Sequence, residues 1–405
     1  MIKRCYILVL ALLVSAALGA CDGNNHGMSP DFSGFPDTPF TIHDESKLIG
    51  GPTAQGRIGD VLLENDVIRV IIQKPSKNAG VNSFGGIIID ADVQGGGGDH
   101  FGSIFPLVNA EWTVNYHNYE VTADGSDGGP KVLRAYGRID AYDYLNLSFI
   151  ADVAQGMVGQ QVTWSRRFDD RGDPFEIYSD LAGVDENVVT DYSLMPGASH
   201  VRIDTTYTNN GEGEVYIPVG EFMNGSGALQ SLIPGMGFAP SLMGQVAGDT
   251  PGIIYAGLPG TRVSYGYFYD PSSFVNPETG NRLKTTSLTF SGVTGVLLGE
   301  ELMQLLAPSA GDKPNVHFVI PAGESKTIMR YFVVGDGTAQ SVYEEALNIF
   351  GASTRKVNGT VVDGSGKLLI SLCPGGLVLY GGPCKRRYQA LKPIGEDAKE
   401  TLYGF

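Results

Sequence analysis

Short strand-like runs follow one another through the body of this chain, and they constrain its fold more than any other feature. From about residue 50 to residue 334 the runs are separated by clusters of Gly, Asn, Asp and Pro, which favour turns. The runs over 188–194, 201–208 and 326–334 alternate apolar with polar side chains, as in a sheet with one face in a core and one in water. No helix-periodic stretch precedes residue 338, which disfavours parallel β-α-β architecture. We therefore predict an all-β fold, a large antiparallel β-sandwich.

The glycine content supports this prediction. Of 405 residues, 56 are Gly, which is about twice the usual share of roughly 7%. Gly adopts the positive φ angles that tight hairpin turns need. The formal net charge is −16 at pH 7, whereas binding to phosphate backbones needs a clustered basic surface. We therefore expect no nucleic-acid partner.

Residues 1–20 carry the features of an export signal. Two basic residues open the chain, an apolar run over 6–14 follows, and the small residues Gly19 and Ala20 precede Cys21. The apolar run is too short to be a membrane-spanning helix. The sequence therefore predicts export.

The segment 18–21 resembles the bacterial lipobox, in which cleavage precedes the Cys and its thiol receives lipid. The resemblance implies that Cys21 carries acyl chains, such as palmitate, that anchor the protein in a lipid bilayer. Residues 21–47 would then form a flexible tether. The expected location is the bacterial cell envelope, in the outer membrane or on the periplasmic face of the inner membrane. An ordinary signal peptide with a chance Cys is the alternative.

One helix is expected near the C-terminus, within a helix and linker over 337–355. Ser341 is a candidate N-cap, and Gly351 ends the segment. The apolar stripe on one side of this helix consists of Val342, Ala346 and Ile349.

The C-terminal segment 356–405 predicts a fragmentary second β module. Its stretch 357–367 alternates and then turns on Asp-Gly-Ser-Gly, which resembles the first hairpin of a carboxypeptidase-regulatory-like sandwich. Only 39 residues follow Gly366, fewer than the roughly 70 to 80 that a seven-strand module needs. Two interpretations stay open: a truncated or frame-shifted end beyond about residue 368, or a short native tail held by a disulfide between Cys373 and Cys384.

Further resemblances lie in the body. The passages 50–60, 65–73 and 84–92 are similar to the N-terminal domain of large exported bacterial lipoproteins. Those lipoproteins often continue into a regulatory-like sandwich and a PHP-type (polymerase and histidinol phosphatase) metallohydrolase domain. The passage 192–210, with a Pro-Gly turn and a strand ending in Thr-Asn-Asn, is similar to the middle of galactose-mutarotase-like supersandwiches. These resemblances imply a supersandwich-like domain over 48–336.

This sequence matches the catalytic residue patterns of these families poorly. A PHP-type site opens with a His-x-His pair, and no two of the six His residues lie within two positions of each other, so we predict that the hydrolase domain is absent. Mutarotase chemistry needs a His acid and a carboxylate base. His117 and His200 are candidates for the acid, and Glu221 and Glu300 for the base, but their spacing singles out none.

An acidic cluster surrounds four consecutive glycines at 95–98. Its members are Asp90, Asp92, Asp99 and His100. Oxygen ligands on a flexible loop suit Ca²⁺. The alternative is a solvated loop between two strands, and we expect no other cofactor.

The first hairpin offers a possible ion pair. Arg57 and Asp60 lie in one turn, and Arg69 follows in the next strand-like run. We predict a buried Arg-Asp pair that fixes this hairpin, with a ligand contact as the alternative.

Aromatic side chains give the best indication of a binding face. The candidates for carbohydrate binding are Trp112, Tyr116, His117, Tyr119, Tyr265, Tyr267 and Tyr269. Sugar rings stack on exposed aromatic rings, whereas packing in the core is the ordinary role of these residues. The alternation over 265–269 predicts that three Tyr side chains share one face of a strand.

Two functions follow from these features. The first is a membrane-anchored lipoprotein whose sandwich is a non-catalytic binding or scaffold domain, for a carbohydrate or for another envelope protein. The alternative is a carbohydrate-active enzyme, similar to an epimerase or a lyase, that works in the sandwich cleft.

Overall fold

The computed structural model describes most of the body of the chain. It covers residues 37–141 and 187–352, apart from gaps at 76, 80–81, 97, 109–111, 214, 217–218, 226–228, 234–236, 239–244, 249–251, 258–260, 275–284, 291–292 and 299–318. Four strands beyond residue 353 are also described. The signal segment, Cys21 and Cys384 lie outside the described residues, as do Glu300 and His317.

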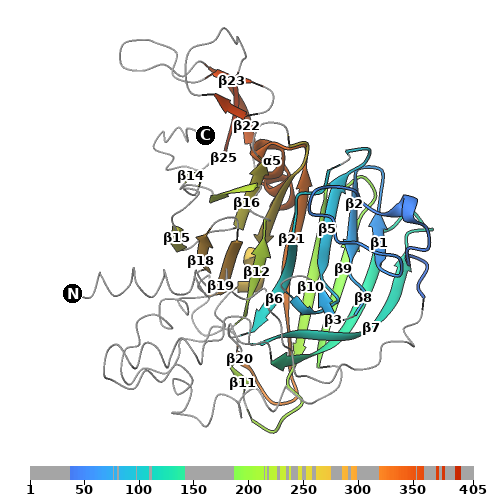
Figure 1. Ribbon diagram of the computed structural model, residues 1–405. Helices are drawn as coiled ribbons and strands as arrows, with labels where there is room; N and C mark the ends of the chain where they lie inside the picture. The colour runs from blue at the N-terminus through green and yellow to red at the C-terminus, as the bar shows by residue number, and fades with distance from the viewer. Residues whose placement is uncertain are drawn as a thin grey trace, which may run out of the picture.

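Two large antiparallel sheets make up the described body, which confirms the all-β prediction (Figure 1). In pairing order, the first sheet contains β1 (Val61–Glu64), β2 (Ile68–Ile72), β5 (Ile88–Val93), β6 (Ser103–Val108), β12 (Val219–Asn224), β19 (Val293–Leu298), β18 (Thr285–Phe290) and β15 (Gln245–Gly248). The second contains β7 (Trp112–Asp124), β8 (Lys131–Ala141), β9 (Val188–Leu194), β10 (His200–Thr208), β21 (Ser325–Gly335), β17 (Ser264–Tyr269), β16 (Gly252–Gly257), β13 (Leu229–Ile233) and β14 (Gly237–Phe238). One pairing, Val108 with Trp112, joins the sheets where the chain passes from β6 to β7.

Alternation of side chains decides which face of each strand enters the core. Along β9 the side chains alternate strictly between buried and half-buried, as the sequence predicts. Strands β10 and β21 pair in register from His200 with Val333 to Thr208 with Ser325, so their apolar positions share the inner face. Burial of this face against the other sheet supplies the main driving force for folding.

The segment before β1 is more ordered than the sequence predicts. Residues 37–47, expected to belong to the tether, contain a 3₁₀ turn η1 (Glu45–Lys47), and Thr41 forms a β-bridge with Val61. Ile42 is buried in the core and Phe40 packs against it. The folded domain therefore begins before the predicted boundary at residue 48, because these apolar side chains cover β1.

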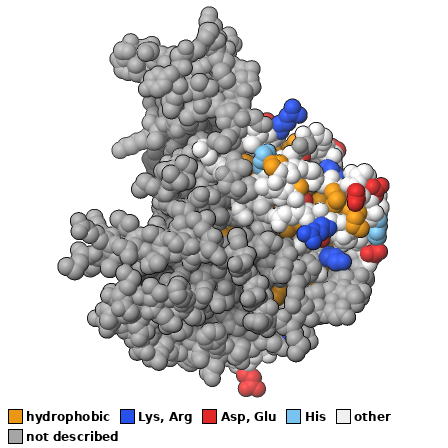
Figure 2. Space-filling model, in the orientation of Figure 1, with side chains coloured by type: hydrophobic (Ala, Val, Ile, Leu, Met, Phe, Trp, Pro, Cys, Tyr) orange, Lys and Arg blue, Asp and Glu red, His pale blue; other side chains and the backbone are white. Residues whose placement is uncertain are grey.

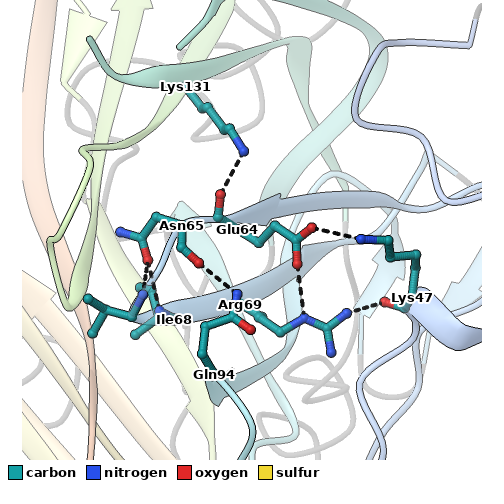
Figure 3. A network of polar contacts seen from close by, with 8 residues as sticks. Lys47, Glu64, Asn65, Ile68, Arg69, Gln94 and Lys131 are labelled. Carbon is teal, nitrogen blue, oxygen red and sulfur yellow. Dashed lines mark hydrogen bonds and ion pairs between the residues drawn. The ribbon is translucent and has the colours of Figure 1, made fainter. Parts of the chain in front are cut away.

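Asparagine 65 locks two hairpins together at one end of the sandwich. Its Oδ1 accepts the N–H groups of Val67 and Ile68, which shapes the β1–β2 turn (Figure 3). Its Nδ2 donates to the carbonyl oxygens of Met195 and Ala198, in the β9–β10 turn, at 2.8 Å each. One side chain thus connects a turn of the first sheet to a turn of the second.

Helix α5 (Ala339–Ile349) packs on the outer face of β17 and β21 (Figure 1). Its N-cap is Thr338 rather than the predicted Ser341, because the Thr338 hydroxyl accepts the Ser341 N–H at 3.1 Å. The predicted end at Gly351 is confirmed by its left-handed φ of +60°. No helix in the described parts of the chain is long and apolar enough to span a membrane.

Smaller elements flank the sandwich. They are the strand pairs β3 (Lys77–Ala79) with β4 (Asn82–Phe84) and β11 (Val215–Tyr216) with β20 (Val319–Ile320), and the 3₁₀ turn η3 (Pro271–Phe274). In the C-terminal segment β22 (Thr354–Gly359) pairs with β25 (Tyr388–Pro393), and β23 (Ser371–Cys373) pairs with β24 (Gly376–Val378). The partner of β22 is therefore the distant β25, whereas the sequence suggested a local hairpin over 357–367.

Candidate functional site

The predicted aromatic binding face lies inside the protein. Five of its tyrosines belong to the hydrophobic core, and each is at most 5% exposed: Tyr116, Tyr119, Tyr265, Tyr267 and Tyr269. His117 is half-buried on β7, and the side chain of Trp112 lies outside the described part. These tyrosines therefore do not form an exposed stacking platform in this structure.

Strand β17 explains why the sequence pattern was ambiguous. The three tyrosines at 265, 267 and 269 do share one face, as predicted, and that face points into the sandwich. The opposite face carries Gly266 and Phe268, which are covered by Val342 of helix α5 and by Phe350, the residue after it. Both faces are buried, so the alternation of Tyr reflects a strand covered on two sides.

A chain of polar side chains crosses the core between the two sheets. Arg330 on β21 donates to the carboxylate of Glu221 on β12 and to the hydroxyl of Thr205 on β10. The Thr205 hydroxyl lies 2.8 Å from that of Thr190 on β9, which lies 2.8 Å from the hydroxyl of Tyr116 on β7. Burial raises the pKa of Tyr116 to about 12, so its hydroxyl stays protonated. This inter-sheet polar chain contains charged groups that the sequence did not link.

Glu221 is not an accessible base. Its side chain is 3% exposed, and Arg330 occupies the carboxylate. Burial raises the pKa of Glu221, whereas the guanidinium opposes that rise by favouring the charged form. The arrangement joins the two sheets and keeps this carboxylate buried.

The contact between His200 and a carboxylate belongs to helix docking. His200 Nδ1 lies 2.7 Å from Oε1 of Glu345 on α5, and its ring meets Tyr331 edge-on at 5.6 Å. The hydrogen bond with His200 lowers the pKa of Glu345. His200 is thus joined to a carboxylate, at the outer face of the sheet where the helix packs.

The four residues of the predicted calcium site do not converge as ligands. Asp90 accepts the backbone N–H groups of Gln55 and Gly56, at 2.7 Å each, through its two oxygens. The Asp99 Oδ1 accepts the N–H groups of Ala91 and Phe101 at 3.1 Å each.

Asp92 is used in the same way, since its two oxygens accept the N–H groups of Val93 and Gly98. His100 follows Asp99 and donates its backbone N–H to the Tyr265 hydroxyl at 3.1 Å. Within the described residues no group of three or more His, Cys, Asp or Glu side chains is arranged to hold a metal ion. The carboxylates instead shape the loops between strands.

The predicted buried Arg-Asp pair at the first hairpin is wrong, because neither Arg57 nor Arg69 pairs with Asp60 among the described ion pairs. Asp60 accepts the backbone N–H groups of Arg57 and Lys74, at 2.7 and 2.9 Å, and burial raises its pKa. Arg69 pairs with Glu64 at 3.2 Å, on the surface side of the hairpin (Figure 3). A buried carboxylate can close a turn by accepting backbone N–H groups, and this is how Asp60 fixes the first hairpin.

Glu64 is the centre of a group of charged side chains at the surface of the first hairpin. Lys47 also pairs with the Glu64 carboxylate, and Lys131 donates to its carbonyl oxygen (Figure 3). Figure 2 shows basic and acidic side chains mixed on this face, with apolar side chains between them. This patch therefore carries both signs of charge and does not by itself favour a ligand of one charge.

The sequence matches no protein-family profile, and no curated protein sequence is significantly similar to it. Solved structures with a similar arrangement include a galactose mutarotase-like protein from Clostridium acetobutylicum, 7% identical over 68% of this chain and 95% of that chain, with a TM-score of 0.35. Another galactose mutarotase-like protein, from Lactobacillus casei, is 10% identical over 68% of this chain and 100% of that chain, with a TM-score of 0.34.

An α-mannosidase from Enterococcus faecalis is also similar, with 10% identity over 71% of this chain and a TM-score of 0.39. This chain spans 30% of the length of that mannosidase. Because these identities and TM-scores are so low, no functional conclusion rests on them.

Proposed function

We propose that this protein is a lipid-anchored lipoprotein of the bacterial cell envelope whose β-sandwich binds or presents a partner without catalysing a reaction. Acylated Cys21 would hold it in the membrane, and the residues before Asp37 would connect the anchor to the folded domain. The expected partners are a glycan or another envelope protein.

One observation carries the non-catalytic part of the proposal. Three described side chains that could serve as an acid or a base are engaged in holding the fold together. Glu221 pairs with Arg330 across the sheets, His200 pairs with Glu345 on the helix, and Asp90 closes a loop. A general acid or base must lie within hydrogen-bond distance of the proton that it transfers. These three groups are instead hydrogen-bonded to other parts of the protein.

The ligand class follows from charge. With a formal net charge of −16, the protein repels polyanions such as uronate-rich glycans. Uncharged or basic glycans are therefore the class to test first.

A glycan array followed by calorimetry tests the binding part. The full chain in detergent micelles would be applied to neutral, basic and uronate-rich glycans. Binding of a neutral or basic glycan, without chemical change to it, would support the proposal. Absence of binding to every glycan would leave an envelope protein as partner, and conversion of a bound glycan would favour the enzyme.

The anchor has a separate test. Metabolic labelling with a palmitate analogue in a bacterial host should label the wild-type chain, and Cys21→Ser should abolish the label and release the protein from membranes. Cys373→Ser serves as the matched control and should stay labelled. Equal labelling of wild type and Cys21→Ser would overturn the lipoprotein assignment.

A further inference from the structure

Asn-Gly dipeptides occur at three places in the chain, 210–211, 224–225 and 358–359. Asn is one of the less durable side chains of proteins, because the backbone nitrogen of the next residue can attack its amide group. A following Gly favours that attack, since it has no side chain to hinder ring closure and its backbone rotates freely. Each dipeptide is therefore a potential site of spontaneous deamidation, and the fold decides which of them reacts.

Two of the dipeptides are held by strands. Asn224 is the last residue of β12 and is paired on both sides, with β6 and with β19. Its carbonyl oxygen also accepts the Gly102 N–H at 2.8 Å. Asn358 and Gly359 both lie in β22, which is paired with β25. Ring closure requires rotation of the backbone between Asn and Gly, and the hydrogen bonds of a strand pair resist that rotation.

Asn210 lies in a different setting. It is exposed and belongs to the loop 209–213, which leads from β10 to β11. The loop residues 209–213 are all described, and they belong to no strand. The backbone between Asn210 and Gly211 is therefore not fixed by a sheet, and water reaches the Asn210 side chain.

Gly211 is restrained by the side chain of Asn209. The Asn209 Oδ1 accepts the Gly211 N–H at 2.9 Å, and Asn209 is 0% exposed. Its Nδ2 donates to the carbonyl oxygens of Gly213 and Ile320, at 2.7 and 2.8 Å. Its backbone N–H and carbonyl oxygen bond to the turn between β20 and β21. A buried amide with all these partners is a fixed acceptor, so it holds the Gly211 nitrogen in one orientation.

We propose that Asn210 is a site of spontaneous deamidation and that Asn209 sets its rate by holding the Gly211 nitrogen out of reaction. The reaction begins when this hydrogen bond opens. The Gly211 nitrogen then loses its proton and bonds to Cγ of Asn210, the bond from Cγ to Nδ2 breaks, and ammonia leaves with that proton. Water opens the resulting succinimide ring at either carbonyl group, which gives aspartate or isoaspartate.

The product changes the loop in charge and in length. A carboxylate replaces a neutral amide, and in isoaspartate the main chain runs through the former side chain and gains a methylene group. The Gly211 N–H then no longer lies where Asn209 Oδ1 accepts it. Deamidation should therefore loosen the connection between the end of β10 and the turn between β20 and β21.

Peptide mapping by mass spectrometry, with enzymatic detection of isoaspartate, tests the proposal on the full chain in detergent micelles. The wild type would be incubated at mildly alkaline pH in native buffer and, separately, in urea. In urea Asn210 and Asn224 should react at similar rates, since Gly follows both. In native buffer Asn210 should react about tenfold faster than Asn224 or more, because loops open more readily than paired strands. A native rate at Asn210 no higher than that at Asn224 would overturn the proposal, whatever any variant does.

Substitutions at Asn209 test its effect on the rate. Asn209→Ala removes the acceptor of the Gly211 N–H, and the native rate at Asn210 should rise about two- to tenfold, the factor that corresponds to one hydrogen bond. Asn209→Asp keeps an acceptor oxygen and loses the Nδ2 donor, so the rate should rise less. An equal rise in the two variants, or no rise in Asn209→Ala, would overturn the assignment to Asn209 Oδ1.

The digest also carries its own controls. The rate at Asn224 shows whether a variant has unfolded, because it would then reach the value measured in urea. Thr208→Ala is the matched control variant, since it removes a neighbouring contact with the Ser325 hydroxyl and leaves the loop bonds of Asn209 in place. Its rate at Asn210 should equal that of the wild type.

Discussion

Glu221 and Arg330 form an ion pair that joins the two sheets through the interior of the sandwich. Glu221 extends from β12 of the first sheet and Arg330 from β21 of the second, and both side chains are 3% exposed. A buried charge is tolerated only when it is paired and hydrogen-bonded. The contact therefore constrains which strands face each other, in addition to holding them together.

Breaking this pair on one side should destabilise the protein strongly. We expect Glu221→Leu to lower the free energy of unfolding by about 3 to 5 kcal/mol, because it leaves the Arg330 charge buried without a partner. The double variant Glu221→Leu, Arg330→Met should lose much less, since no charge then remains in the core. Urea denaturation of the three proteins measures the effect, and equal losses for the single and double variants would contradict a structural ion pair.

The side chain of Asn65 should stabilise the folded protein by joining two hairpins. Asn65→Ala removes four hydrogen bonds to two turns, and we expect a loss of about 1 to 3 kcal/mol in the free energy of unfolding. Gln340→Ala, which removes one exposed side-chain contact on α5, is the control and should change stability little. A loss no larger than that of the control would mean that water replaces the Asn65 contacts.

Global stability should depend on pH in a direction set by Asp90 and Asp99. Their pKa values are raised in the folded state, so their contribution is fully present below about pH 4 and is lost as pH rises through about 6 and about 7. Groups with lowered pKa, such as Glu64 and Glu345, act oppositely and lose their contribution as pH falls below their ordinary value of 4.5. Chemical denaturation at several pH values should show wild-type stability falling between about pH 5 and about pH 8, and Asp99→Asn falling less.

The docking of α5 offers a fourth test. The hydrogen bond between His200 and Glu345 links β10 to the helix, and the two side chains are about one-fifth exposed. We expect His200→Ala to weaken docking by about 0.5 to 1.5 kcal/mol, the usual net contribution of one hydrogen bond. Faster amide exchange along 339–349, with unchanged exchange in β9, would confirm a local effect.

The sequence predicted the sheets better than the contacts between them. Alternation over 326–334 predicts that Arg330 shares the inward face with Ile328 and Phe332, as it does. The alternation does not identify Glu221 as the partner of Arg330. That contact depends on which strands of the two sheets pack against each other, and these two strands lie about a hundred residues apart in the chain. Long-range pairing is set by topology, which local periodicity does not encode.

At the candidate sites too, the sequence predicted local features but not the contacts that depend on the whole fold. Asp90 and Asp99 were predicted as metal ligands, whereas in the structure they accept backbone N–H groups. Metal binding and backbone capping use the same carboxylates, and only the positions of neighbouring N–H groups distinguish the two. The tyrosines of β17 were predicted on one face, but the helix that covers the other face lies some seventy residues later. The N-cap was misplaced because Thr338 and Ser341 are both good caps, and the choice follows from where the chain leaves β21.

The central claim, a sandwich that binds without catalysis, is tested most directly by measuring anomer interconversion of neutral sugars by NMR with the full chain present. We predict the same α-to-β exchange rate with and without protein, together with binding of any glycan identified on the array. An exchange rate accelerated by the wild type and lost in Glu221→Gln would contradict the account, because it would place an accessible base where the structure shows a buried ion pair.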